Sequence, residues 1–192
     1  MPLRVLRLSL IAWLLFAPPA FATAADWSLA QLMQQFAAIG HRQARFTETR
    51  ELALLDSSLN SAGTLTFDAP DSLNKTYDPP DGRSYIITGN RLTIRGQDGR
   101  EKIVLLDNSP QLLAYVDSLR AVLAGNLKRL QSDFETRLSG NAADWLLALT
   151  PRTPQQVQRI EITGRHTAVL QFTVIEQGGD RIVTRLHAND EK

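Results

Sequence analysis

The chain has 192 residues, which suits one domain or at most two small ones. Hydrophobic residues make up 43% of it and charged residues 21%, values typical of globular proteins, so disordered, collagen-like and coiled-coil structures are disfavoured. The 21 lysines and arginines nearly balance the 20 aspartates and glutamates, so the chain lacks the basic field that nucleic-acid binding needs. The absence of cysteine excludes disulfide scaffolds, thiolate metal sites and thiol catalysis.

Residues 1–24 have the features of a secretory signal peptide. Arg4 and Arg7 precede an apolar run, and Ala22-Thr23-Ala24 places small residues where a signal peptidase cleaves. A membrane anchor needs about 20 apolar residues, and this run is roughly half that long. Removing two arginines leaves a mature chain, residues 25–192, with a net charge of −1. We expect a soluble, exported protein of one domain.

Two segments have the spacing of amphipathic helices. In the first, Asp26 is a candidate N-cap, apolar residues recur every three or four positions through Ala37, and Gly40 stands where a C-terminal cap belongs. The second runs over residues 110–130, begins with proline at the first helical position, and is expected to bend or break at Gly125-Asn126. Its apolar stripe must be buried, so we expect it to lie on one face of a sheet.

Short segments with a period of two predict many β-strands. The expected strands are residues 43–52, 61–68, 73–79, 84–89, 91–96, 101–106, 133–139, 145–150, 157–163, 167–175 and 181–187. Glycine-containing pairs such as Gly89-Asn90 and Asp98-Gly99 separate several of them and tolerate positive φ, which indicates tight turns between antiparallel neighbours. The predicted class is therefore α+β, with a curved antiparallel sheet holding helices.

These strands present more apolar surface than two modest helices can cover on a flat sheet. If the sheet curls, its inner face encloses a space that side chains fill or that an apolar ligand occupies, and the periodicity leaves both open. The residues expected on the inner face or on the helix opposite it are Phe46, Leu65, Phe67, Tyr77, Ile87, Leu92, Ile94, Leu112, Val116, Leu119 and Leu123.

Motifs for catalysis or metal binding are scarce. His41, His166 and His187 are far apart, with no pairing that would place two imidazoles on one face. No serine elbow and no phosphate-binding glycine loop occurs, and carboxylates such as Glu48 and Asp78 are interpreted as solvated caps. We expect no metal, no cofactor and no catalytic residue. A Ser-His-Asp triad needs no fixed spacing, so a lipid or acyl-ester hydrolase stays the alternative.

Several segments follow one another in a characteristic order. They are Ala-Arg-Phe-Thr-Glu at 44–48, Gly-Thr-Leu-Thr-Phe-Asp-Ala-Pro at 63–70, the strand 73–77 before Asp-Pro-Pro, the turn Gly89-Asn90 with 92–94, and Trp-Leu-Leu-Ala-Leu-Thr-Pro at 145–151 before 160–164. In this order they resemble the periplasmic outer-membrane lipoprotein carriers, the LolA-like family. The stretch 110–130 is similar to a version of that family found near aryl-polyene or fatty-acid assembly genes.

The resemblance implies an incomplete, strongly curved antiparallel β-barrel of about eleven strands, with helices closing its mouth over an apolar cavity that receives acyl chains. The implied protein is a non-enzymatic, monomeric periplasmic carrier. Its cargo would be an acylated lipoprotein, another lipid or an aryl-polyene-type lipid, passed from an inner-membrane donor complex to an outer-membrane acceptor. A ligand-free accessory protein of an envelope complex is a further alternative.

One position departs from the family pattern. The general carriers have an arginine, thought to bond the lid helices, immediately before the proline that corresponds to Pro70, and this chain has Ala69 there. The resemblance implies that the closed, empty state lacks this donor unless Lys75, Arg83 or Arg91 reaches the same carbonyls. Charge-assisted hydrogen bonds contribute about 1.5–3 kcal/mol, so we expect a more open cavity, longer cargo retention and a specialised pathway.

Export predicts a mature N-terminus at Ala25, because small residues at positions 22 and 24 precede it. N-terminal sequencing or intact-mass measurement of protein recovered from the periplasm is expected to show this end, with cleavage after Ala22 as the close rival. A membrane-bound product that still begins with Met1 would contradict both cleavage sites and the soluble carrier.

Overall fold

The computed structural model describes residues 27–54, 57–153 and 156–187. The predicted signal peptide and Asp26 therefore lie outside the described residues. Among the described residues, no helix is long and apolar enough to cross a membrane.

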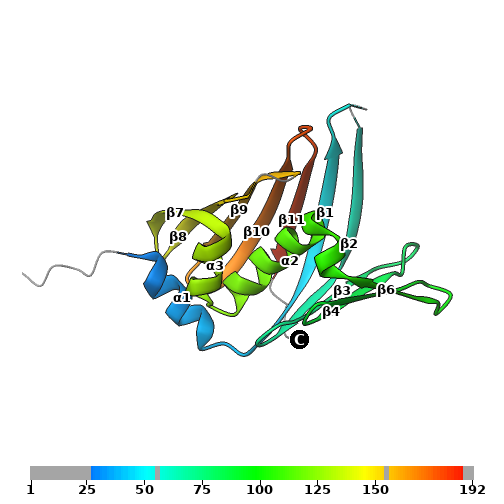
Figure 1. Ribbon diagram of the computed structural model, residues 1–192, viewed down its shortest axis with the longest axis horizontal. Helices are drawn as coiled ribbons and strands as arrows, with labels where there is room; N and C mark the ends of the chain where they lie inside the picture. Colours follow the sequence, from blue (N-terminus) through cyan, green and yellow to red (C-terminus); the bar gives the residue numbers. More distant parts are fainter. Residues whose placement is uncertain (1–26, 55–56, 154–155, 188–192) are drawn as a thin grey trace, which may run out of the picture.

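The described residues form a single antiparallel sheet of eleven strands, with helices beside it (Figure 1). The strands are β1 (His41–Leu52), β2 (Ser57–Asp68), β3 (Ser72–Tyr77), β4 (Ser84–Thr88), β5 (Arg91–Arg95), β6 (Glu101–Leu105), β7 (Phe134–Asn141), β8 (Asp144–Pro151), β9 (Val157–Arg165), β10 (Ala168–Glu176) and β11 (Arg181–His187). Their order is β6-β5-β4-β3-β2-β1-β11-β10-β9-β8-β7, so β6 and β7 are free edges and the barrel is incomplete. The predicted fold class, α+β with a curved, unclosed antiparallel sheet, is confirmed.

The first helix, α1 (Leu29–Ala37), has its N-cap two residues later than predicted. Ser28 is the N-cap, and it forms a capping box with Gln31, so the assignment of Asp26 as the cap was wrong. The helix ends at Ala38 in the right-handed region, and Gly40 does not cap it. A reciprocal pair of hydrogen bonds satisfies two amides at the helix start and decides where the helix begins.

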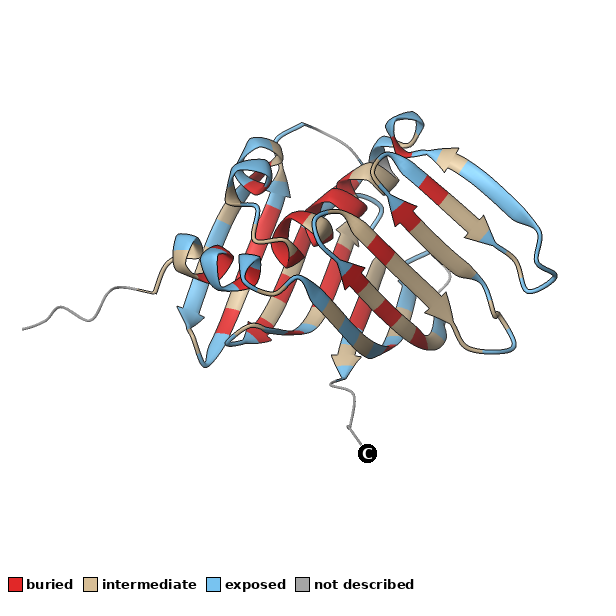
Figure 2. Cartoon of the chain, turned by 90° about the horizontal axis from the view of Figure 1, so that it is seen from below, coloured by how far each residue is buried: buried red, intermediate tan, exposed pale blue. Residues whose placement is uncertain are grey.

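The second apolar stripe forms two helices, α2 (Pro110–Leu123) and α3 (Leu127–Asp133), preceded by a short 3₁₀ turn at Leu106–Asn108. The predicted break at Gly125-Asn126 is confirmed: Gly125 has a φ of 65°, and the Asn126 side chain caps α3. Figures 1 and 2 show α2 lying across the concave face of the sheet, with buried residues gathered where helix and strands face each other. We call α2 and α3 the lid helices.

The strand β2 begins four residues before its predicted start. Residues 57–60 have no alternating apolar pattern, and Leu59 is 61% exposed. They are strand because the β1–β2 ladder continues to the pair Leu52 and Ser57, so backbone hydrogen bonding extends the hairpin beyond the buried part of the sheet.

The turn at Gly125 brings α1 against the lid helices. A Cβ placed at Gly125 would lie 2.1 Å from the carbonyl oxygen of Met33 and 2.5 Å from the amide nitrogen of Ala37. Since both atoms belong to the α1 backbone, neither can rotate away. Glycine is therefore required at this turn for both its conformation and its small size.

Gly125→Ala is expected to destabilise the protein by well over 2 kcal/mol, because a left-handed conformation costs about 1–2 kcal/mol and overpacking adds about 1–3 kcal/mol. Gly99→Ala is the matched control, since Gly99 has a φ of 78° but no atom within 4 Å of the added methyl group. Chemical denaturation measures both. Equal losses of stability in the two variants would show that α1 does not press on the turn.

Candidate ligand cavity and lid contacts

A cavity of about 320 Å³ lies between α2 and the concave face of the sheet. Seven of the predicted inner-face residues line it: Leu65, Tyr77, Ile87, Leu92, Leu112, Val116 and Leu119. They come from β2, β3, β4, β5 and α2, so the structure brings together side chains from segments far apart in the sequence. Whether they contact a ligand stays a prediction.

The other four predicted residues, Phe46, Phe67, Ile94 and Leu123, are not in the lining of this cavity and pack in or against the core instead. The reason is clearest for Phe46, which pairs with Gly63 across the ladder. Its ring lies over that glycine, within 2.8 Å of where a Cβ would be. Because Gly63 on β2 has no side chain, the Phe46 ring packs over the sheet at that position. The ring is therefore not part of the cavity lining.

A charged cluster around Glu48 and Lys75 lies in the lining of this largely apolar cavity, in a region that we call its floor. The interpretation of the Glu48 carboxylate as a solvated cap was therefore wrong. The Lys75 Nζ forms an ion pair with Glu48, and the two side chains are only 13% and 11% exposed. The Tyr77 hydroxyl donates to Glu48 Oε1 at 2.8 Å, and the Thr184 hydroxyl donates to Glu48 Oε2 at 2.7 Å. Both oxygens of the carboxylate are therefore satisfied by donors from β3 and β11.

Both partners of this pair are held in their charged forms. Burial alone would raise the pKa of Glu48, but the charge of Lys75 and hydrogen bonds from Lys75, Thr184 and Tyr77 outweigh burial, and the pKa lies below its usual value. Burial alone would lower the pKa of Lys75, but its neighbours Tyr115, Glu48 and Tyr77, together with the hydrogen bond to the Glu48 carboxylate, leave its pKa above the usual value. The pair contributes a dipole, with no net charge, to the cavity wall.

Strand alternation contained the signal for this cluster. Residues two apart share a face, so Glu48 must point to the same side as buried Phe46, and Lys75 to the same side as buried Leu73. The sequence therefore shows which face of its strand each of the two side chains occupies. It does not show that β1 and β3 lie close enough for these side chains to pair across β2. That proximity depends on Gly63, since a Cβ there would lie 2.0 Å from the carbonyl oxygen of Thr76.

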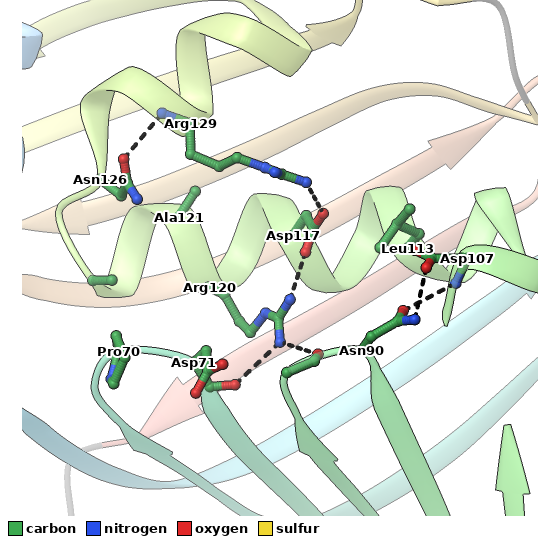
Figure 3. Close-up of a pocket in the computed structure, with 12 residues that line it drawn as sticks. Pro70, Asp71, Asn90, Asp107, Leu113, Asp117, Arg120, Ala121, Asn126 and Arg129 are labelled. Atoms are coloured by element: carbon green, nitrogen blue, oxygen red, sulfur yellow. Dashed lines mark hydrogen bonds and ion pairs between the residues drawn. The ribbon is translucent and has the colours of Figure 1, made fainter. Parts of the chain in front are cut away.

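A second group of polar residues ties α2 to the rim of the sheet (Figure 3). Arg120 Nη1 donates to the carbonyl oxygen of Gly89 at 2.7 Å, in the β4–β5 turn, and to that of Asp71 at 3.2 Å, in the β2–β3 turn. Its other terminal nitrogen donates to Asp117 Oδ1 at 2.7 Å. One guanidinium therefore joins a lid helix to two turns, and its planar fork makes this possible.

Asp117 is itself shared between the two lid helices. Its side chain is 8% exposed, and its second oxygen accepts a hydrogen bond from Arg129 Nη2 of α3 at 2.7 Å. The rim is further joined to the short 3₁₀ turn by Asn90, whose side chain donates to Asp107 Oδ2 at 2.7 Å. These residues surround a polar pocket of about 290 Å³ (Figure 3). It shares no lining residue with the apolar cavity.

This arrangement differs from the expectation about Ala69. Ala69 lies in the β2–β3 turn, where its amide donates to the carbonyl oxygen of Gly40 at 2.8 Å. Two of the three cations considered as substitutes have other partners, since Lys75 pairs with Glu48 and Arg83 with Asp81. The donor is on the helix, at Arg120, and the acceptors are on the rim, so the direction of the hydrogen bond is the reverse of the one expected.

An unclosed antiparallel barrel with helices over an interior cavity defines a class of proteins that can hold an apolar ligand inside. This chain belongs to the outer membrane lipoprotein carrier protein LolA-like family, whose model matches residues 17–188. The family inferred from the order of the strand motifs is confirmed. No sequence among the curated proteins matches the chain.

Solved structures with a similar course of the chain have low sequence identity to it. A DUF1329 family protein from Desulfovibrio piger ATCC 29098 is 12% identical, with a TM-score of 0.45 over 85% of this chain and 92% of that one. A LolA superfamily protein from Nitrosomonas europaea is 9% identical, with a TM-score of 0.45 over 86% and 95%. A putative outer membrane lipoprotein-sorting protein domain from Vibrio parahaemolyticus is 10% identical, with a TM-score of 0.45 over 85% and 92%.

Arg120→Met is expected to loosen α2 from the rim, because it removes three hydrogen bonds to a charged donor and each such bond contributes about 1.5–3 kcal/mol. The measurement is hydrogen exchange of the α2 amides, which is expected to accelerate. Arg129→Met is the control, since it removes a partner of Asp117 and leaves the rim bonds in place. Equal acceleration in both variants would assign the effect to Asp117 and not to the contact with the rim.

Proposed function

We propose that this protein is a non-enzymatic periplasmic carrier that encloses the acyl chain of a lipid-linked cargo and moves it from the inner toward the outer membrane. The observation that supports the proposal best is the 320 Å³ cavity between α2 and the concave sheet, lined by apolar side chains from strands and helix alike. Membership of the lipoprotein-carrier family supports the same function. The cargo is an acylated lipoprotein, another lipid or an aryl-polyene-type lipid.

The size of the cavity favours one chain at a time. Ligand cavities in proteins range from about 300 to 1,000 Å³, and this one is near the lower limit. Each buried methylene contributes about 0.8 kcal/mol, so enclosing a single chain offsets much of the free energy of leaving a bilayer. Cargo with several chains would require α2 to move away from the sheet.

Exchange of cargo requires that α2 move, and the contacts of α2 are suited to this. On its inner side α2 offers apolar surface to the sheet, which tolerates sliding, and at its C-terminal end Arg120 holds it by hydrogen bonds to the rim. Breaking those bonds exposes groups that water can satisfy. The inner-membrane donor complex and the outer-membrane acceptor would act on this end of the helix.

The proposal is tested by the lipids that the protein retains. Protein purified from the periplasm is expected to carry an apolar lipid that extraction and mass spectrometry identify, and an acyl ester incubated with it is expected to be recovered intact. Hydrolysis of the ester would favour the alternative of a lipid or acyl-ester hydrolase. An empty protein that binds no apolar fluorophore would favour a ligand-free accessory role.

Leu119→Ala is expected to weaken binding of a fluorescent fatty-acid probe about three- to tenfold, because it removes apolar surface from the cavity wall. The control is Leu147→Ala on β8, a fully buried position that is not in the lining. That substitution should cost about 2–5 kcal/mol of stability, more than Leu119→Ala, and leave probe binding intact. Equal losses of stability, with no probe binding by the parent protein, would show that Leu119 is ordinary core.

A further inference from the structure

The Lys75–Glu48 pair has a position that a purely structural ion pair does not need. Both residues are in the lining of the cavity, with α2 residues Val116 and Leu119 also in that lining. They reach each other across β2 beside the Phe46 ring, which lies over Gly63. Removing two charges from water is costly, and an apolar pair of the same volume is often as stable. We therefore expect the two charges to have a role in the cavity other than stability.

The two members of the pair differ in what they can still bind. Glu48 is saturated, because Lys75, Tyr77 and Thr184 donate to its two oxygens. An ammonium group has three donors, and within the described chain Glu48 is the one hydrogen-bond acceptor of Lys75. The rings of Phe46 and Tyr77 also surround it, with centroids 4.7 and 5.0 Å from Nζ, and Tyr115 is near enough to affect its pKa. Lys75 thus has unused donors and is in the lining of the cavity.

A second donor lies beside it. Tyr115 of α2 also lines the cavity, and burial raises the pKa of its hydroxyl, which therefore stays protonated. The floor of the cavity accordingly offers an ammonium from the sheet and a phenol from the helix. Both can donate to an acceptor oxygen carried by a ligand.

The charge balance decides which acceptor fits. The described lining has two cations, Arg50 and Lys75, and two anions, Glu48 and Glu176, so its net charge is zero. An ionised carboxylate would add an unbalanced charge to an apolar space beside Glu48, which is costly. A plain hydrocarbon would leave the ammonium donors unpaired. A neutral carbonyl oxygen satisfies them without adding charge.

We propose that the Lys75 ammonium, held in place by Glu48, donates a hydrogen bond to the neutral carbonyl oxygen of a single ester- or amide-linked acyl chain. This inference rests on the proposed carrier function and specifies its ligand. The cavity would then distinguish an esterified chain from a free fatty acid of the same length. Apolar surface supplies most of the affinity, and the ion pair supplies the selectivity.

The test compares three ligands of equal chain length, methyl palmitate, palmitate and hexadecane, as competitors of a fluorescent apolar probe bound to the mature protein at neutral pH. A hydrogen bond to a charged donor is worth about tenfold in affinity or more. Methyl palmitate is therefore expected to displace the probe at about one tenth of the concentration needed for the other two. Tighter binding of palmitate, or equal binding of all three, would overturn the proposal.

A variant that removes both charges extends the test. Lys75→Met with Glu48→Gln is expected to abolish the preference for the ester over hexadecane. The matched control is Arg45→Met with Asp78→Asn, an ion pair that also joins β1 to the end of β3 but has side chains 48% and 40% exposed. The control should keep the preference. A preference that persists without Lys75 and Glu48 would assign recognition to other residues.

The outcomes separate this inference from the proposed function. Equal binding of all three ligands keeps the carrier and overturns only the role of Lys75. Failure of every ligand and of the probe to bind would overturn the carrier function and this inference with it. The ranking of ligands on the parent protein stands even if the double variant does not fold.

Discussion

The structure depends on one constraint, the need of an unclosed, curved sheet to cover its concave apolar face. The two edges, β6 and β7, do not meet, so the sheet cannot bury its inner side chains by closing on itself. The lid helix α2 covers them instead, and its own apolar stripe is buried by the same contact. Sheet and helix therefore stabilise each other, and the cavity is the space left where they do not fit completely.

Two polar clusters lie next to this shared interface. On the floor of the cavity, Glu48 receives a full set of donors, so its charge is tolerated inside an apolar surface. At the rim, Arg120 and Asp117 fix the end of α2 to the turns and to α3. Between them the helix contacts the sheet mainly through apolar side chains, which resist separation but do not specify one position. The position of the helix is specified by the polar contacts of Arg120 and Asp117 at the rim.

The hydrogen bonds at the rim have their donor on the lid helix and their acceptors on the sheet. The family resemblance implied a rim arginine that bonds lid carbonyls, whereas here Arg120 of the lid helix bonds two carbonyls of the rim. The physical requirement is a multivalent donor on one side and free carbonyls on the other. Turns supply free carbonyls readily, so the donor can come from the helix when position 69 is alanine.

The sequence by itself determined the eleven strands, the antiparallel turns, the broken lid helix at Gly125 and seven of the side chains in the cavity lining. These follow from local periodicity and from residues that tolerate positive φ, both of which can be seen within a few positions. Only the tertiary structure decided that Glu48 and Lys75 meet across β2, that Arg120 reaches the turns at Asp71 and Gly89, and that Phe46 covers Gly63. Those contacts join residues on different strands and helices, and their distances depend on how far the sheet curves, which no local pattern records.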